Sequence, residues 1–133
     1  MMHFAVNWLA VIVAGVVSMA IGAGWYMSLS KQWLAALGKS RDQLNAGPSP
    51  FIWAIVVELV MAYFIAGLTP LLTGATTPLN GALVGAHMWL GFVLTSMILN
   101  HRYQNSKWSL TLIDGAHLLL VLIAQGVVIG LFG

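Results

Sequence analysis

Residues 110–132 read LTLIDGAHLLLVLIAQGVVIGLF and contain one charged side chain, Asp114. A helix needs about 20 mostly apolar residues to cross the hydrocarbon core of a bilayer, so this stretch is long enough to span it. Three further segments of the same kind precede it, at about 4–29, 51–72 and 79–99. The strands of a membrane barrel would be about 10 residues long with alternating polarity, a pattern that these segments lack. The sequence therefore predicts an all-α integral membrane protein, built as a bundle of four transmembrane helices.

The composition of the chain supports this prediction. Of its 133 residues, 60% are hydrophobic and only 6% are charged, whereas a soluble domain carries roughly 25% charged residues. The five cations are spread over separate loops and form no continuous basic face, which excludes a nucleic-acid partner despite the basic pI. The absence of cysteine excludes disulfides, thiolate metal sites and cysteine nucleophiles. We expect a single membrane domain over residues 1–133, with the lipid bilayer as its main partner.

The positions of the positive charges predict the orientation in the membrane. All Lys and Arg side chains fall in two of the three loops, and they are Lys31, Lys39, Arg41, Arg102 and Lys107. The loop between the second and third segments and both chain ends contain none. Because such residues stay on the cytoplasmic side, we expect both termini outside. The loop at about 30–50 is then cytoplasmic, and the helical spacing of Trp33, Leu34 and Leu37 predicts that it lies in the membrane interface.

Several short motifs follow one another along these segments. Asn7-Trp8-Leu9-Ala10-Val11 opens the first segment and Gly24-Trp25-Tyr26 closes it, Trp89-Leu90-Gly91-Phe92 lies in the third, and Leu112-Ile113-Asp114-Gly115-Ala116-His117 enters the fourth. With these motifs in this order, nearly the whole chain resembles a family of small four-span bacterial membrane proteins, domain of unknown function 1761. The resemblance implies a multi-pass protein of the bacterial inner (cytoplasmic) membrane. It implies no activity, substrate or catalytic residue.

Polar side chains inside the four segments are the candidate binding residues, namely Glu58, His87, Asp114, His117 and Gln125. A charged group at bilayer depth costs about 2.5–3.5 kcal/mol for Asp, Lys or Arg, so such groups face protein or water. With a rise of about 1.5 Å per residue, Glu58 and His117 each lie roughly 10 Å from the cytoplasmic edge. We expect these two side chains to face each other as a titratable pair. His87 and Gln125 lie deeper, at roughly 18 and 22 Å, and Asp114 lies about one turn inside the fourth helix.

Each candidate also has a purely structural interpretation. Glu58 is either a proton or cation site or a protonated acid bonded to a neighbouring helix, and His117 is either its partner or a neutral imidazole that ties helices together. His87 fits a packing and hydrogen-bonding role. Asp114 in the first turn of a helix would complement the positive end of the helix dipole.

Three kinds of function fit these residues. The first is transport, or ion and proton conduction, through Glu58 and His117, with a small ion or small molecule as ligand. The second is a structural or accessory membrane subunit whose polar residues only bridge helices. The third is a membrane enzyme or cofactor carrier, which the sequence favours least. No catalytic triad or phosphate-binding loop is evident, and His87 and His117 differ in depth by roughly 8 Å, too much for one haem. We expect no metal and no cofactor.

Small residues recur at four-residue spacing in three of the segments, and they are Ala14, Ser18 and Gly22, then Gly81 and Gly85, then Gly126 and Gly130. This spacing lets helix backbones pack closely in lipid. Because the four helices are uniformly apolar, they have surface to spare for a homo-oligomer.

Overall fold

Four long apolar helical spans run through the structure, a computed structural model that describes residues 3–44 and 47–133. The spans are α1 (Trp8–Ser28), α3 (Ser49–Thr73), a composite of α4 (Pro78–Met88), the π-helical segment η2 (Trp89–Leu94) and α5 (Thr95–Tyr103), and finally α6 (Trp108–Phe132). Each is long and apolar enough to cross a membrane. The predicted all-α, four-helix membrane fold is confirmed, and the protein is a multi-pass membrane protein.

Local sequence signals fix where the helices begin and end. The side-chain oxygen of Asn7 accepts hydrogen bonds from two backbone N–H groups in the first turn of α1, at 3.1 and 3.3 Å. Thr77 caps α4 in the same way, and Pro78 follows at the first helical position, where its missing N–H costs nothing. Gly74 ends α3 with a φ of 84°, a left-handed conformation that glycine adopts without strain.

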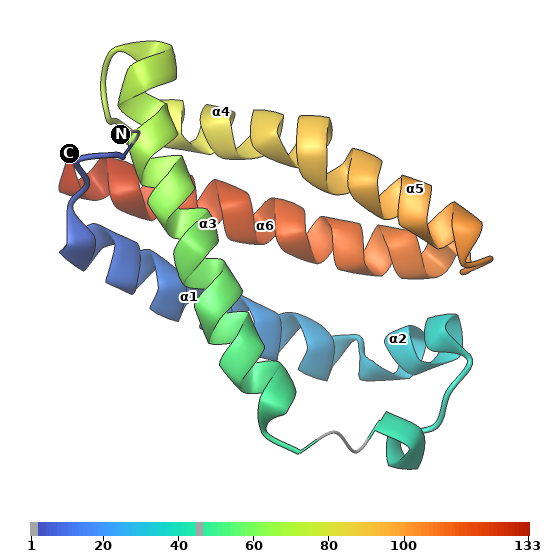
Figure 1. Ribbon diagram of the computed structural model, residues 1–133. Coiled ribbons are helices and arrows are strands. Elements are labelled where there is room, and N and C mark those ends of the chain that lie inside the picture. The colour runs from blue at the N-terminus through green and yellow to red at the C-terminus, as the bar shows by residue number, and fades with distance from the viewer. Residues whose placement is uncertain (1–2, 45–46) are drawn as a thin grey trace.

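The helix α6 lies at the centre of the bundle and contacts the other three spans. In Figure 1, α1 and the α4–α5 span run roughly along α6 on either side of it, whereas α3 crosses them obliquely. Both chain ends and the turn between α3 and α4 lie at one end of the bundle. This arrangement gives α6 one face toward α4 and another toward α1 and α3.

Glycine allows the closest approach between helices, which is between α4 and α6. A Cβ atom at position 81 would lie 2.0 Å from the carbonyl oxygen of Gly126, and one at position 85 would lie 2.3 Å from that of Leu122. The two backbones therefore touch at Gly81 and Gly85, where no larger residue fits. These glycines, whose spacing was noted in the sequence, pack within the chain.

Two short helices connect α1 to α3 at the opposite end from the termini. They are α2 (Ser30–Leu37) and the 3₁₀-helix η1 (Arg41–Leu44), and residues 45 and 46 of the predicted 30–50 loop lie outside the described residues. The Lys107 ammonium donates to the carbonyl oxygen of Ala35 at 3.2 Å, which joins α2 to the loop between α5 and α6. All Lys and Arg residues belong to this end of the bundle, which we call the charged end.

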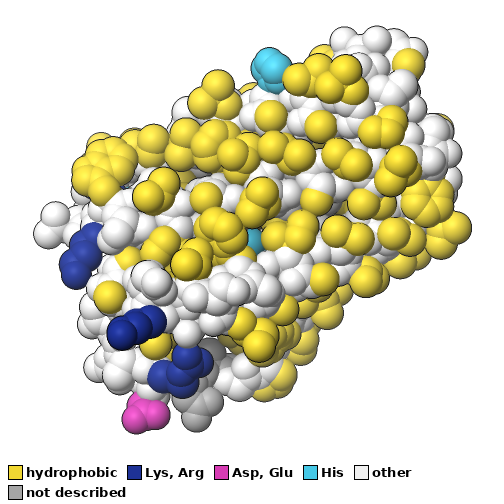
Figure 2. Space-filling model, turned by 180° about the vertical axis from the view of Figure 1, so that it is seen from behind, with side chains coloured by type: hydrophobic (Ala, Val, Ile, Leu, Met, Phe, Trp, Pro, Cys, Tyr) yellow, Lys and Arg dark blue, Asp and Glu magenta, His cyan; other side chains and the backbone are white. Residues whose placement is uncertain are grey.

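The outer surface of the spans is apolar. Figure 2 shows hydrophobic side chains over most of one face and Lys and Arg side chains gathered at one end of it. Large residues such as Val16, Phe92 and Leu112 are exposed on different spans. Such a surface fits contact with lipid rather than with water.

Candidate functional site

The largest fully buried side chain among the described residues, Gln125, joins three helices. Its amide group donates to the Ser18 hydroxyl of α1 at 2.9 Å and to the backbone carbonyl oxygen of Glu58 in α3 at 3.0 Å. Ser18 in turn donates to the Ala14 carbonyl oxygen at 2.7 Å. The carbonyl oxygen of the Gln125 side chain is buried without a hydrogen-bond partner among the described residues. Gln125 therefore both fixes α6 against α1 and α3 and leaves one acceptor unused.

Glu58 places a carboxyl group in the same interface. The residue is only 5% exposed, and its Oε2 atom is buried without a hydrogen-bond partner in the part of the chain that the structure describes. No Lys or Arg reaches it, because those residues gather at the charged end. A charged carboxylate inside an apolar bundle requires donors or a cation. The described residues provide neither, so a charged Glu58 carboxylate would have no partner within the bundle.

His117 lies nearer the charged end, half-buried between α6 and α1. Its Nε2 atom is also buried without a hydrogen-bond partner among the described side chains and backbone groups. Gly22 faces this atom, and a Cβ at position 22 would lie 3.3 Å from it. The Tyr26 ring meets the imidazole edge to face, with ring centroids 4.9 Å apart. The small residue at position 22 thus leaves room for the imidazole beside α1.

Asp114 is bound to α1 rather than to a helix N-terminus. Its Oδ1 atom accepts a hydrogen bond from the Tyr26 hydroxyl at 2.6 Å. The helix α6 begins at Trp108, so its first turn contains no acidic residue and Asp114 lies in the second turn. The helix-dipole interpretation of Asp114 is therefore wrong, because the fourth helix begins earlier than the sequence suggested.

The structure groups the candidates differently from the predicted Glu58–His117 pair. Glu58 lies with Gln125 beside Ser18, whereas His117 lies beside Gly22, one helical turn nearer the charged end. No described hydrogen bond or ion pair joins Glu58 to His117. Equal residue offsets give equal depths only in helices of equal tilt, whereas α3 crosses α6 obliquely (Figure 1).

His87 is not part of this cluster. It is exposed on the outside of α4, and its Nδ1 atom lies 2.7 Å from the carbonyl oxygen of Leu83 on the same helix. His87 and Gln125, which the sequence placed at similar depths, do not meet within one chain, because His87 is exposed on the outside of the bundle and Gln125 is buried inside it.

Three aromatic residues that sequence reasoning did not select complete the site. Besides Tyr26, the Trp25 indole of α1 donates to the Ile113 carbonyl oxygen at 3.1 Å, and the Trp89 indole of η2 donates to that of Gly115 at 2.8 Å. The only signal for these contacts in the sequence is the position of the aromatic residues near the ends of spans, which is equally typical of interfacial belts.

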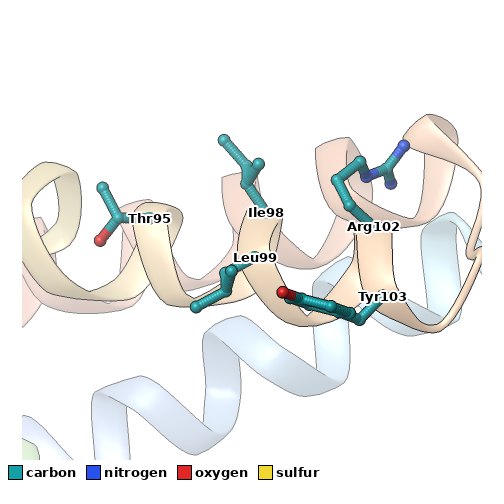
Figure 3. A pocket seen from close by; sticks show the side chains of 5 residues that line it. All are labelled: Thr95, Ile98, Leu99, Arg102 and Tyr103. Carbon is teal, nitrogen blue, oxygen red and sulfur yellow. The ribbon is translucent and has the colours of Figure 1, made fainter.

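A shallow hollow on the outer side of α5 lies apart from the polar cluster. Thr95, Ile98, Leu99, Arg102 and Tyr103 line it (Figure 3). The Arg102 guanidinium stacks over the Trp108 ring at 3.7 Å and donates to the Ser106 carbonyl oxygen at 3.0 Å. Arg102 thus stabilises the loop between α5 and α6. Within residues 3–44 and 47–133, no three His, Asp or Glu side chains lie close enough together to hold a metal ion.

Comparison with known proteins gives one match. A family model described as a protein of unknown function (DUF1761) matches residues 9–130. No curated protein and no solved structure matches the chain.

Proposed function

We propose that this chain, which belongs to the DUF1761 family of proteins of unknown function, moves protons across the membrane through Glu58 and His117. Four side-chain polar atoms of the described residues are buried without a hydrogen-bond partner, and three of them carry this proposal, namely Glu58 Oε2, His117 Nε2 and the Gln125 side-chain oxygen; the fourth, Arg102 Nε, lies at the charged end. Such atoms are rare in folded proteins and call for a specific explanation. Carboxylates and imidazoles inside a membrane commonly serve proton relays.

The positions of the two titratable groups support a relay between them. The Gln125 amide joins the backbone of Glu58 to Ser18 on α1, and His117 lies against Gly22 on the same helix. Ser18 and Gly22 are one turn apart on α1, about 6 Å along its axis, whereas Gln125 and His117 are about two turns apart on α6, about 12 Å along that axis. Because helical side chains tilt toward the helix N-terminus, the Glu58 carboxyl extends from α3 toward the charged end, which is the side on which His117 lies.

We further propose that the protein lies in the bacterial inner membrane with both termini outside and the charged end in the cytoplasm. The five Lys and Arg residues support this orientation, because none of them lies at the end that holds the termini. Labelling of single cysteines from each side of the membrane tests it.

We also propose that copies of the chain form a homo-oligomer. The exposed imidazole of His87 supports this, because it lies about 14 Å from the start of the third span, where contact with lipid is costly. A His87→Cys variant, in a chain without other cysteines, should form a disulfide-linked dimer in the membrane. A variant that stays monomeric under oxidation argues against an interface at this face.

Proton flux into liposomes tests the proposed function. The purified protein is reconstituted around a pH-sensitive dye, and a potassium gradient with valinomycin imposes a membrane potential. We expect proton uptake above that of protein-free liposomes and its loss in Glu58→Gln, whereas Asp42→Asn, an equal change at an exposed acid of η1, leaves it intact. Uptake no greater than in protein-free liposomes, or a fully active Glu58→Gln, refutes proton movement through this site.

The competing function is a structural subunit, and the bridging amide of Gln125 is the observation that favours it. In that case Glu58→Gln and His117→Gln would change only the yield of folded protein. If the liposomes take up potassium or sodium but no protons, the proposed site stands and the ion that it conducts is a metal cation instead of a proton.

A further inference from the structure

Tyr26 stands where α1, α2 and α6 meet. Its hydroxyl binds Asp114, its ring contacts the imidazole of His117, and on the other side it contacts the ring of Trp33 in α2, with centroids 5.4 Å apart. Tyr26 is two residues from the end of α1 at Ser28. It therefore lies between the buried groups of the bundle and the charged end.

The turn of α6 that carries Asp114 is fixed from two sides. The indoles of Trp25 and Trp89 donate to the carbonyl oxygens of Ile113 and Gly115, the residues on either side of Asp114. These carbonyl groups belong to a helix interior, where they already have backbone partners, so the extra hydrogen bonds serve to position the helix. Two neighbouring spans thus hold the turn of α6 that carries Asp114 in place.

Polar side chains follow one another along α6 from the charged end toward the interior of the bundle. Asp114 and His117 are three residues apart and lie on one face, with about 5–6 Å between Cβ atoms at this spacing. One turn toward the charged end, the Thr111 hydroxyl contacts His101 at 2.6 Å and Arg102 at 3.2 Å. The titratable and charged groups around Asp114 are therefore Tyr26 from α1, His117 on its own helix, and His101 and Arg102 from α5.

We propose that Asp114 is the group through which protons from the charged end reach His117, and that Tyr26 is the residue that positions it. This inference rests on the proposed function and adds its access route. The Asp114 carboxylate takes a proton from hydronium and leaves water. Neutral Asp114 then gives the proton to Nε2 of neutral His117, which becomes imidazolium, and the Glu58 carboxylate accepts it and restores the neutral imidazole. Each step moves one proton. Because no hydrogen bond among the described residues joins Asp114 to His117 or His117 to Glu58, a water molecule must bridge each of these two transfers.

Two variants of Asp114 separate its charge from its place in the fold. In the same liposome assay, we expect Asp114→Asn to reduce proton uptake to the level of protein-free liposomes and Asp114→Glu, which keeps a carboxyl group, to retain uptake. Tyr26→Phe removes only the hydroxyl. It should move the pH at half-maximal uptake by about 0.5–1 unit, the equivalent of one hydrogen bond. Tyr103→Phe, the same change at a side chain that is 85% exposed, should leave the pH profile unchanged.

The outcomes distinguish this inference from the function on which it rests. If wild-type protein moves protons and Glu58→Gln does not, but folded Asp114→Asn does, the access route is refuted while the function stands. An unchanged pH profile in Tyr26→Phe refutes the positioning role. If the wild-type protein moves no protons, the proposed function fails and the access route falls with it.

Discussion

Replacement of Gly81 by alanine tests the packing on which the bundle depends. A Cβ at this position would lie 2.0 Å from the Gly126 carbonyl oxygen and 2.5 Å from its carbonyl carbon, and both are backbone atoms that cannot rotate away. Real Cβ atoms essentially never come within 3.0 Å of a non-bonded heavy atom from another part of the chain. The helices α4 and α6 must therefore move apart by about 1 Å, a gap that already forfeits a quarter to a half of each dispersion contact.

The expected cost follows from two opposing effects. Overpacking costs about 1–3 kcal/mol, and the rigid backbone contact places Gly81→Ala at the upper end of that range. Alanine is favoured over glycine within a helix by roughly 0.5–1 kcal/mol, which offsets part of the cost. We expect a net loss of about 2 kcal/mol in the free energy of unfolding.

A matched control is available at Gly24. A Cβ there would have no neighbour within 4 Å, so Gly24→Ala should stabilise α1 by roughly 0.5–1 kcal/mol. Reversible unfolding in mixed micelles, followed by circular dichroism and tryptophan fluorescence, gives both values. If Gly81→Ala is as stable as Gly24→Ala, the two backbones do not touch as described and the reasoning from glycine packing is refuted.

Three further predictions follow from other contacts. Asn7→Ala removes the cap of α1 and should cost about 1 kcal/mol in the same unfolding measurement; an unchanged value contradicts the cap. Gln125→Leu removes two buried hydrogen bonds and should cost about 1–2 kcal/mol, given about 0.6 kcal/mol for an average bond in a membrane; a more stable variant would mean that the amide is not a net tie. Cysteine at Thr76 (Thr76→Cys) should be labelled only from outside and at Lys107 (Lys107→Cys) only from the cytoplasm; the reverse pattern overturns the proposed orientation.

The number and type of the spans could be read from the sequence because apolar length is a local property. Each of the segments at 4–29, 51–72, 79–99 and 110–132 corresponds to a helical span in the structure. Nothing local, however, specified that the third span contains a π-helical segment at Trp89–Leu94. Directly after it, the hydroxyl of Thr95, the first residue of α5, donates to the Gly91 carbonyl oxygen at 2.8 Å, a backbone contact that many helical Ser and Thr residues make without any such change.

The candidate site was predictable in its residues but not in its grouping. Glu58, Asp114, His117 and Gln125 all lie within the bundle, as expected from the cost of polar groups in lipid. The position of Glu58 relative to the other three depends on the angle at which α3 crosses α6, and this angle depends on long-range packing. The hydrogen bond between Tyr26 and Asp114 likewise joins residues that are 88 positions apart, and no spacing rule along one helix predicts such a contact.

The two faces of α6 are packed by different kinds of contact, and this difference determines which helices can move. On the face toward α4, the backbones of Gly81 and Gly126 touch. If α4 slid along α6, larger residues would enter a space that only glycine fits. Toward α1 and α3, the buried ties are the two hydrogen bonds of Gln125, each worth about 0.6 kcal/mol on average in a membrane. A conformational change that exposes Glu58 to one side of the membrane would therefore displace α3, while α4 and α6 remain a fixed pair.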